Sequence, residues 1–247
     1  MILMYHHVCP PERVPTNRAD LEGWQFNIAP DDFRAQLQTL QKRGFEFVSL
    51  TDYVNSLHLP YRLRAKQMAI TFDDGWRDNH EFALPILQSL GLTATFYVVT
   101  GEMQGVDAAK RMSVRALQDL ANAGMEIGGH SVTHPNLATL SLERLQSELG
   151  DCKRKLQDDL GIEVRHFAYP GGRFNRLVVE QCELAGYQSA VCSIGWGRNR
   201  STNRYTLFRE TLDGSSTAIK RRLQVSSIVR LLLAARARAR LRLALSR

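Results

Sequence analysis

The sequence has few of the features that mark disulfide-rich or membrane-spanning proteins. It holds four cysteines in 247 residues and no C-x-x-C pair, which argues against a disulfide framework or a structural zinc knuckle. No apolar run reaches the roughly 18 residues of a membrane-spanning helix. The first residues show neither a basic segment nor an apolar stretch of signal length, so we expect the cytoplasm as compartment.

Acidic residues are missing from the end of the chain. The net charge is +7, from 32 basic and 25 acidic residues. Nine of the basic residues lie between Lys220 and Arg247, so residues 1–219 carry 23 basic and 25 acidic residues. The basicity therefore belongs to a tail, and no nucleic-acid partner is expected. We divide the chain into a domain of residues 1–219 and a basic tail of residues 220–247.

The tail permits two interpretations. Its Ala, Leu and Arg residues favour a helix, but arginines recur at every second position and spread around a helical wheel, which leaves no clean apolar face. These arginines are Arg236, Arg238, Arg240 and Arg242. The simpler expectation is a solvated, partly disordered end. The alternative is attraction to anionic lipid headgroups, with the chain lying peripherally on the inner membrane face.

Short apolar runs alternate with amphipathic segments through the rest of the chain. Strands are expected at residues 2–5, 45–50, 68–72, 93–99 and 125–129, near Phe167 and up to Val191. Helices are expected around Phe33–Leu40, up to Leu90, from Ser113 to Ala123, from Leu142 to Leu160 and from Phe174 to Ala185. This α/β alternation predicts a mostly parallel sheet, open or closed into a barrel, with functional groups at strand ends.

Two predicted strands end in pairs of ionisable residues. Asp73 and Asp74 follow the strand at 68–72 and repel one another unless a cation or hydrogen bonds compensate. His130 and His134 follow the strand at 125–129, and two histidines four residues apart can bind one metal ion. Each pair alone is equally compatible with an ordinary turn.

Taken together, these residues predict a metal site. Asp74, His130 and His134 would supply the three protein ligands of a catalytic zinc-like centre, in which further positions stay open for water and substrate. Asp73 would then lie beside the metal, where a general base is needed. Zinc is the expected ion, with iron, cobalt and nickel as alternatives.

At these residues the sequence resembles a known family. The segments TFDDG (71–75), HSVTH (130–134) and FAYPGG (167–172) resemble, in order and spacing, the motifs of NodB-type polysaccharide deacetylases, carbohydrate esterase family four. The similarity covers residues 2–210. It implies a distorted (β/α) barrel with fewer than eight regular repeats. It also implies hydrolysis of the acetamido group of N-acetylglucosamine-containing polysaccharides, oligosaccharides or lipid-linked glycans.

The resemblance also implies a role for each matched residue. Asp73 resembles the catalytic base, and Asp74, His130 and His134 resemble the metal ligands. The backbone N–H of Gly171 would help to bind the oxyanion. Substrate contacts are expected from Tyr169, Trp76 and Trp196. Trp196 is the candidate aromatic wall for the sugar, unless it is an ordinary core tryptophan.

Two positions depart from the family pattern. Ala168 stands where members carry an arginine that orients the base, and Arg209 is a candidate replacement. The late Leu-x-His motif, whose histidine protonates the leaving amine, is missing, because no histidine follows His166. The start of the chain, Leu-Met-Tyr-His6-His7, resembles instead the circularly permuted branch that deacetylates β-1,6-linked poly-N-acetylglucosamine.

That resemblance makes His6 the expected general acid, although a strand-end histidine without a role is an alternative. His7 should point to the opposite face if the strand continues, because side chains alternate along a strand. In the expected reaction Asp73 deprotonates a water held at the metal, the water attacks the acetamido carbonyl, and His6 protonates the departing amine.

Three other functions share some of these features. A non-haem iron oxygenase uses two histidines and one carboxylate, but it does not need Asp73, and its sheet is usually antiparallel. A hydrolase of another amide or a cyclic imide could use the same fold. A metal- or glycan-binding module with decayed catalysis would agree with the loss of the arginine at Ala168.

Overall fold

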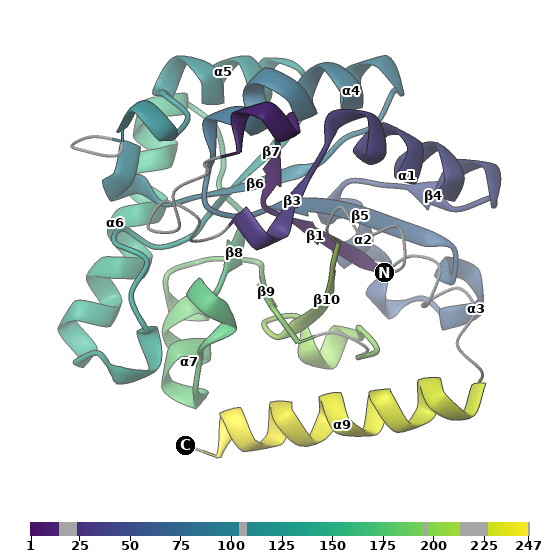
Figure 1. Cartoon of the computed structure of the whole chain (residues 1–247). Coiled ribbons are helices and arrows are strands. Elements are labelled where there is room, and N and C mark those ends of the chain that lie inside the picture. Colours follow the sequence, from purple (N-terminus) through teal and green to yellow (C-terminus); the bar gives the residue numbers. More distant parts are fainter. Residues whose placement is uncertain (15–23, 104–107, 195–196, 213–226, 247) are drawn as a thin grey trace.

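The computed structural model describes residues 1–14, 24–103, 108–194, 197–212 and 227–246 (Figure 1). Within these residues seven parallel strands form a ring in the order β1-β10-β9-β8-β7-β6-β5, and the pairing of β1 with β5 closes it. Strand β4 pairs with β5 as an eighth, outer strand. The expectation of a distorted (β/α) barrel with fewer than eight repeats is therefore confirmed.

The barrel strands are short and most of their residues are buried. They are β1 (Ile2–Tyr5), β5 (Gln67–Phe72), β6 (Thr95–Val98), β7 (Glu126–Gly129), β8 (His166–Ala168), β9 (Ser189–Cys192) and β10 (Leu207–Thr211). The outer strand β4 (Glu46–Phe47) is shorter than the strand expected at 45–50, and β2 (His7–Val8) pairs with β3 (Asn27–Ile28) apart from the barrel. Strand β10 was not predicted.

The first strand of the chain lies beside the last strand of the barrel. Ile2 pairs with Arg209 on β10 and with Ala69 on β5. The strand that leads to His6 is therefore one of the seven barrel strands. Every barrel pair is parallel, which brings the carboxyl ends of all seven strands to one end of the ring. Circular permutation of the family fold stays a prediction.

Helices cover the outside of the ring (Figure 1). They are α1 (Pro30–Lys42), α2 (Leu50–Asn55), α3 (Tyr61–Arg64), α4 (Leu84–Ser89), α5 (Val114–Asn122), α6 (Leu142–Leu160), α7 (Arg176–Leu184) and α9 (Ser227–Leu245). Ser113 caps α5, and Gly161, with φ 66°, ends α6. The cap of α2 is Ser49, which accepts from the N–H of Asp52.

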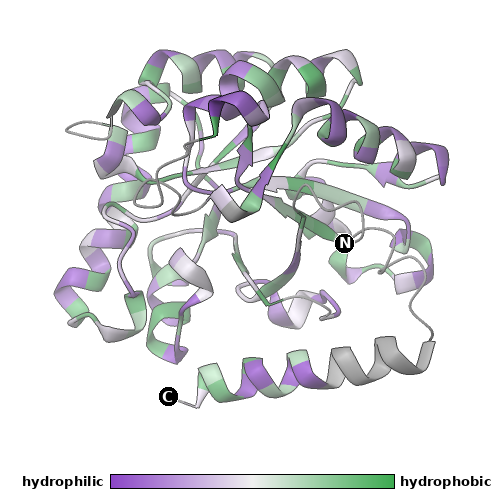
Figure 2. Cartoon of the chain, viewed as in Figure 1, coloured by the Kyte–Doolittle hydropathy of each residue, from purple (hydrophilic) through white to green (hydrophobic). Residues whose placement is uncertain are grey.

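The apolar side chains form two layers. One layer lies within the ring, and α2 closes it at the amino ends of the strands. Its buried members are Ile2, Leu50, Tyr53, Val54, Leu57, Ala69, Tyr97, Ala168, Val191 and Leu207. The larger one lies between the strands and the surrounding helices. Figure 2 shows the resulting pattern, with hydrophobic strands at the centre and helices that alternate between hydrophobic and hydrophilic residues.

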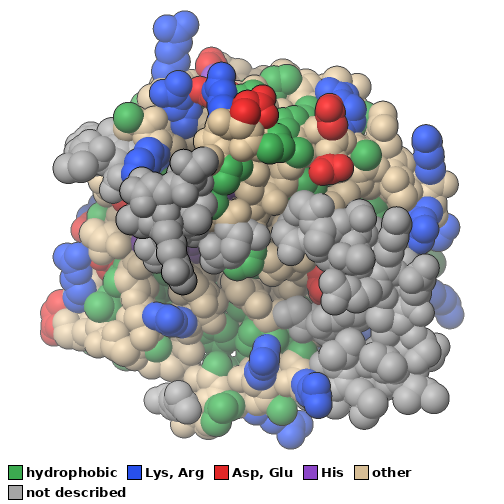
Figure 3. Space-filling model, in the orientation of Figure 1, with side chains coloured by type: hydrophobic (Ala, Val, Ile, Leu, Met, Phe, Trp, Pro, Cys, Tyr) green, Lys and Arg blue, Asp and Glu red, His purple; other side chains and the backbone are tan. Residues whose placement is uncertain are grey.

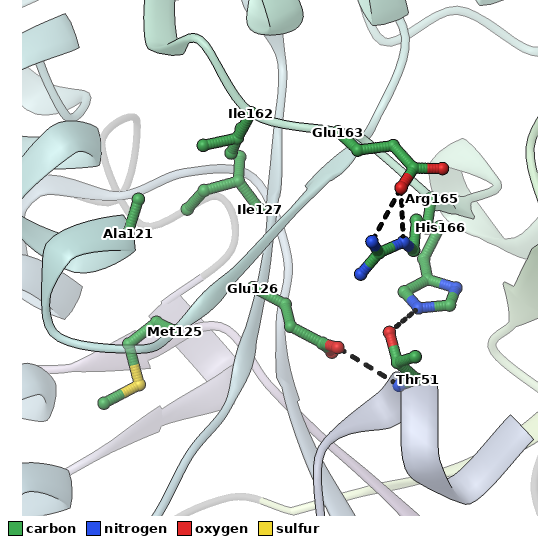
Figure 4. A pocket seen from close by; sticks show the side chains of 9 residues that line it. All are labelled: Thr51, Ala121, Met125, Glu126, Ile127, Ile162, Glu163, Arg165 and His166. Atoms are coloured by element: carbon green, nitrogen blue, oxygen red, sulfur yellow. Dashed lines mark hydrogen bonds and ion pairs between the residues drawn. The ribbon is translucent and has the colours of Figure 1, made fainter. Parts of the chain in front are cut away.

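A polar network fixes α2 at the amino end of the barrel. The carboxylate of Glu126 accepts from the backbone N–H of Leu50 at 3.0 Å and from the hydroxyl of Thr95 at 2.7 Å. His166 lies between the hydroxyls of Thr51 and Ser189, at 3.0 and 2.9 Å. Figure 4 shows the cavity of about 330 Å³ beside this network. It opens at the end of the barrel opposite to Asp73, so it is separate from the predicted metal site.

The tail differs from the simpler expectation. Residues 227–245 form a helix, α9, and within its described part Ala237 is buried in the main core while Leu241, Ala244 and Leu245 pack partly against it. The helical wheel therefore has an apolar face, made of small and aliphatic residues between the arginines. No helix in the described part of the chain is apolar and long enough to span a bilayer.

Candidate metal centre and active site

Three side chains converge at the carboxyl ends of β5 and β7. The carboxylate Oδ1 of Asp74 lies 3.4 Å from Nε2 of His130 and 3.5 Å from Nε2 of His134. The three ligand atoms lie within 4.8 Å of one another, so a single ion can contact all of them. One carboxylate and two imidazoles suit a divalent transition metal, and the residues predicted as ligands are those that the fold brings together.

Hydrogen bonding and charge prepare the two histidines for a cation. Nδ1 of His130 lies 2.7 Å from the carbonyl oxygen of Ala168, and donation to it leaves Nε2 as the atom directed at Asp74 and available to a cation. Burial lowers the pKa of His130, but the hydrogen bond and charge of the aspartates outweigh it, so the pKa is raised. Burial, followed by the charge of His130, lowers the pKa of His134 to about 4. At neutral pH the ring of His134 is therefore uncharged, which is the form that binds a metal.

The backbone at this site is held in conformations that only glycine adopts freely. Among the described non-glycine residues a positive φ occurs at Asp74 (74°), Ser131 (67°) and His134 (56°). Each left-handed residue costs about 1–2 kcal/mol. All three belong to the ligand-bearing segments, so the surrounding structure must hold the strained turns in place.

Glu148 on α6 provides much of that support. It is 1% exposed, and its Oε2 accepts from the backbone N–H groups of Val132 and Thr133, both at 2.8 Å. Its Oε1 accepts from the hydroxyl of Thr133 at 2.6 Å, and Arg144 forms an ion pair with it at 2.9 Å. The carboxylate thereby fixes the loop between the two histidines. Sequence analysis did not identify Glu148.

Asp73 is paired with Arg209. Nη1 and Nη2 of the arginine donate to Oδ1 and Oδ2 of the aspartate, each at 2.6 Å. Asp73 is 3% exposed and Arg209 is 1% exposed. Burial raises the pKa of Asp73, but the charge and hydrogen bonds of Arg209 outweigh it, so the pKa lies below its ordinary value. Asp73 is therefore ionised at neutral pH.

Arg209 reaches Asp73 from a different strand than the family pattern implies. Its Nε donates to the carbonyl oxygen of Cys192, and Nη1 also donates to the hydroxyl of Thr71 at 3.2 Å. Ala168, on β8, is fully buried in the layer within the ring. Arg209 thus lies, from β10, beside Asp73, where the family pattern expects an arginine from position 168.

The two adjacent histidines after β1 have different surroundings. The ring of His6 stacks on Phe26 with centroids 4.7 Å apart, and its buried Nδ1 has no hydrogen-bond partner among the residues that the structure describes. Burial lowers the pKa of His6, while Asp73 and Asp74 raise it, and burial outweighs them. His7 instead pairs through Nδ1 with Asp78 at 2.5 Å. Strand β1 ends at Tyr5 and His7 belongs to β2, so the alternation expected along one continuous strand does not apply, although the two rings have different partners.

Trp76 supports a metal ligand. Its Nε1 donates to Oδ2 of Asp74 at 3.1 Å. The guanidinium of Arg111 lies 3.4 Å from the centre of the indole, and the ring of His7 lies 4.2 Å from it. Both groups contact the indole, which stays partly exposed, and substrate contact by Trp76 stays a prediction.

The other predicted substrate residues have different outcomes. Tyr169 is fully buried, stacks on Phe174 and donates its hydroxyl to the carbonyl oxygen of Tyr205 at 2.9 Å, so its side chain is a core element and the prediction of substrate contact is wrong. Trp196 lies outside the described residues. Gly171 is exposed just after β8 with φ 58°, and its role at the oxyanion stays a prediction.

The fold and these residues define a hydrolase of the polysaccharide deacetylase family. The sequence profile of that family matches residues 61–190, which is more than half of the chain. The chain belongs to this family.

Comparison with individual proteins agrees. The chain is 25% identical to YxkH of Bacillus subtilis over 208 residues, which cover 84% of the chain and 69% of YxkH. It is 30% identical to a peptidoglycan-N-acetylglucosamine deacetylase of Bacillus cereus over 129 residues, 52% of the chain and 57% of that protein. The deacetylase PplD of Streptococcus pyogenes superposes with a TM-score of 0.77 at 25% identity, covering 91% of the chain and 97% of PplD.

Proposed function

We propose that this chain removes the acetyl group from N-acetylated amino sugars in a glycan, with a divalent metal ion at Asp74, His130 and His134. One observation carries the proposal: the three ligand atoms converge within 4.8 Å beside the buried pair of Asp73 and Arg209. A member of a deacetylase family that keeps the base, its arginine partner and a complete ligand set retains the parts needed for hydrolysis.

The metal, when bound, would polarise the amide carbonyl and make water a stronger nucleophile. Zinc is the proposed ion, with iron, cobalt or nickel as alternatives for the same donors. His130 is oriented for binding by the carbonyl of Ala168, and Asp74 is oriented by the indole N–H of Trp76. Both contacts reduce the reorganisation needed when the ion binds.

The remaining steps belong to the residues around the ligands. Asp73 accepts the proton of the attacking water, and Arg209 holds its carboxylate in one orientation while keeping it ionised. The N–H of Gly171 donates to the carbonyl oxygen as that atom becomes negative. His6 donates a proton to the nitrogen as the C–N bond breaks, which yields acetate and a free amine.

The relatives support a class of substrate. The Bacillus cereus relative is named for N-acetylglucosamine in peptidoglycan, and we propose an N-acetylglucosamine-containing polysaccharide, oligosaccharide or lipid-linked glycan for this chain. Biosynthesis of an exopolysaccharide is one setting in which such an activity is used. We propose the cytoplasm, at the inner membrane face, as the location.

The rival functions have less support. The parallel barrel and the aspartate pair do not favour an oxygenase. A decayed binding module was favoured by the loss of the family arginine at Ala168, but Arg209 now provides a guanidinium to Asp73. Hydrolysis of another amide or of a cyclic imide is the remaining alternative, because it would use the same groups.

The test is acetate release from β-1,6- and β-1,4-linked N-acetylglucosamine oligomers by zinc-loaded protein. We expect release by the wild type, none by Asp73→Asn despite unchanged zinc binding, and loss of both by His130→Ala. The exposed His58 offers a control, and His58→Gln should behave as the wild type. If the zinc-loaded wild type releases acetate from neither oligomer, the sugar substrate is wrong.

A further inference from the structure

The C-terminal helix α9 has one face against the protein and one face outward. Side chains are described from residue 236 to residue 246. Ala237 is 4% exposed and Leu241, Ala244 and Leu245 are partly buried against the main core. Their spacing of four, seven and eight residues places them on one side of a helix. This side fixes the orientation of α9 on the protein.

The arginines lie in two rows on either side of that buried face. At about 100° per residue, Arg236 and Arg240 fall on one flank and Arg238 and Arg242 on the other. All four are exposed. Leu243, three residues after Arg240, continues the flank of Arg236 and Arg240 and is 58% exposed. The described surface that α9 presents to solvent therefore carries two rows of arginines, with Ala239 and Leu243 as its exposed apolar residues.

Basic side chains dominate this edge of the molecule. Figure 3 shows Lys and Arg side chains, with hydrophobic ones between them, along the lower edge where α9 lies. No acidic residue occurs from Lys220 to the end of the chain, whereas residues 1–219 carry slightly more acidic than basic residues. The excess positive charge thus lies in the C-terminal segment that contains α9, and it is not neutralised within that segment.

We propose that α9 docks the protein on an anionic lipid surface, with the two rows of arginines at the headgroup phosphates and Leu243 at the boundary of the acyl chains. Arginines are attracted to the negative surface of an anionic leaflet, and an exposed leucine beside them can bury its side chain at the headgroup boundary. Long arginine side chains extend sideways to phosphates while the helix axis stays at the interface. Each contributes about 1 kcal/mol near an anionic leaflet.

A nucleic acid is a poorer match to the same surface. Residues 227–247 contain no aromatic residue, Asn, Gln or His, so the helix has neither stacking groups nor amides for reading bases. The exposed Leu243 beside Arg236 and Arg240 gains nothing from a phosphate backbone, but it gains from an apolar layer beneath the phosphates. The outward leucine is the feature that separates the two partners.

The experiment is co-sedimentation of the full chain with vesicles of phosphatidylcholine, with and without phosphatidylglycerol. We expect binding to the anionic vesicles only, weakening as salt is raised. Replacing the four arginines with glutamine should reduce the partition coefficient by at least about tenfold. Replacing them with lysine should preserve most of the binding, and Leu243→Ser should lower it several-fold.

Two readouts keep this proposal separate from the proposed function. Acetate release from a soluble oligosaccharide should be the same in all these variants, because none of the changed residues lies at the metal site. Equal sedimentation of the glutamine variant and the wild type would overturn the proposal. So would equal binding to neutral vesicles, or tighter binding to duplex DNA than to anionic vesicles.

Discussion

The carboxylate of Asp73 and the guanidinium of Arg209 meet in two parallel hydrogen bonds of 2.6 Å inside the barrel. The two residues lie 136 positions apart in the sequence. Asp73 follows β5 and Arg209 belongs to β10, and β1 separates the two strands. The pair places an ionised carboxylate next to the three candidate metal ligands, and Arg209 supplies the counter-charge that the burial of Asp73 requires.

Breaking this pair should destabilise the protein. Arg209→Gln leaves the carboxylate of Asp73 buried without a counter-charge, and we expect the free energy of unfolding to fall by about 3–5 kcal/mol. In the double variant with Asp73→Asn the charge is gone, so most of that loss should be recovered, while acetate release stays abolished. Urea denaturation of the two single variants and the double variant measures the coupling. Strictly additive losses would show that the pair does not act as a unit.

Glu148 should affect metal affinity without touching the metal. Glu148→Gln removes the charge that accepts from Val132 and Thr133, so the loop that carries His134 should lose its fixed position. We expect zinc affinity to fall about 10–100-fold, as for other side chains that orient ligands. Competition with a chromogenic chelator measures it. Asp151→Asn, an exposed position on the same helix, is the matched control; equal affinities in the two variants would make Glu148 a purely structural residue.

The proposed acid can be tested through the leaving group. His6→Ala should reduce acetate release from an N-acetylglucosamine oligomer by about 10²–10⁴-fold, because the amine must be protonated as it leaves. Hydrolysis of 4-nitrophenyl acetate should fall far less, since nitrophenolate leaves without a proton. Asp73→Asn should reduce both rates. Parallel losses on the two substrates in His6→Ala would assign another role to His6.

His166 should make stability depend on pH. Burial lowers the pKa of His166 to about 4, against about 6.5 in an unfolded chain. Above pH 6.5 both states are neutral and the stability is complete. Between pH 6.5 and 4 the histidine is protonated in the unfolded state but stays neutral in the native state. The free energy of unfolding should therefore decrease as the pH falls, by up to about 3 kcal/mol.

Urea denaturation at several pH values measures this dependence. His166→Gln lacks the titrating ring, so its unfolding free energy should vary less over the same interval than that of the wild type. His58→Gln, which alters an exposed histidine, should keep the wild-type dependence. Identical pH profiles of His166→Gln and the wild type would contradict the prediction.

Local sequence patterns determined most elements of this fold and the candidate ligands of its site. Alternating apolar runs and caps such as Ser113 and Gly161 act through neighbouring residues, so they could be recognised along the chain. Asp74, His130 and His134 could be recognised because ligand chemistry restricts residue type and strand ends converge in a parallel barrel.

The tertiary structure decided what depends on partners remote in sequence. A glutamate at position 148, on the apolar side of an amphipathic helix, was a signal of function, because a buried charge needs partners. The sequence alone does not identify Val132 and Thr133 as those partners. The indole of Trp76 packs against His7 and Arg111, and no local sequence pattern predicts these contacts. Arg209 became the partner of Asp73 only when seven strands closed into a ring, because closure brings side chains from separate strands into one interior.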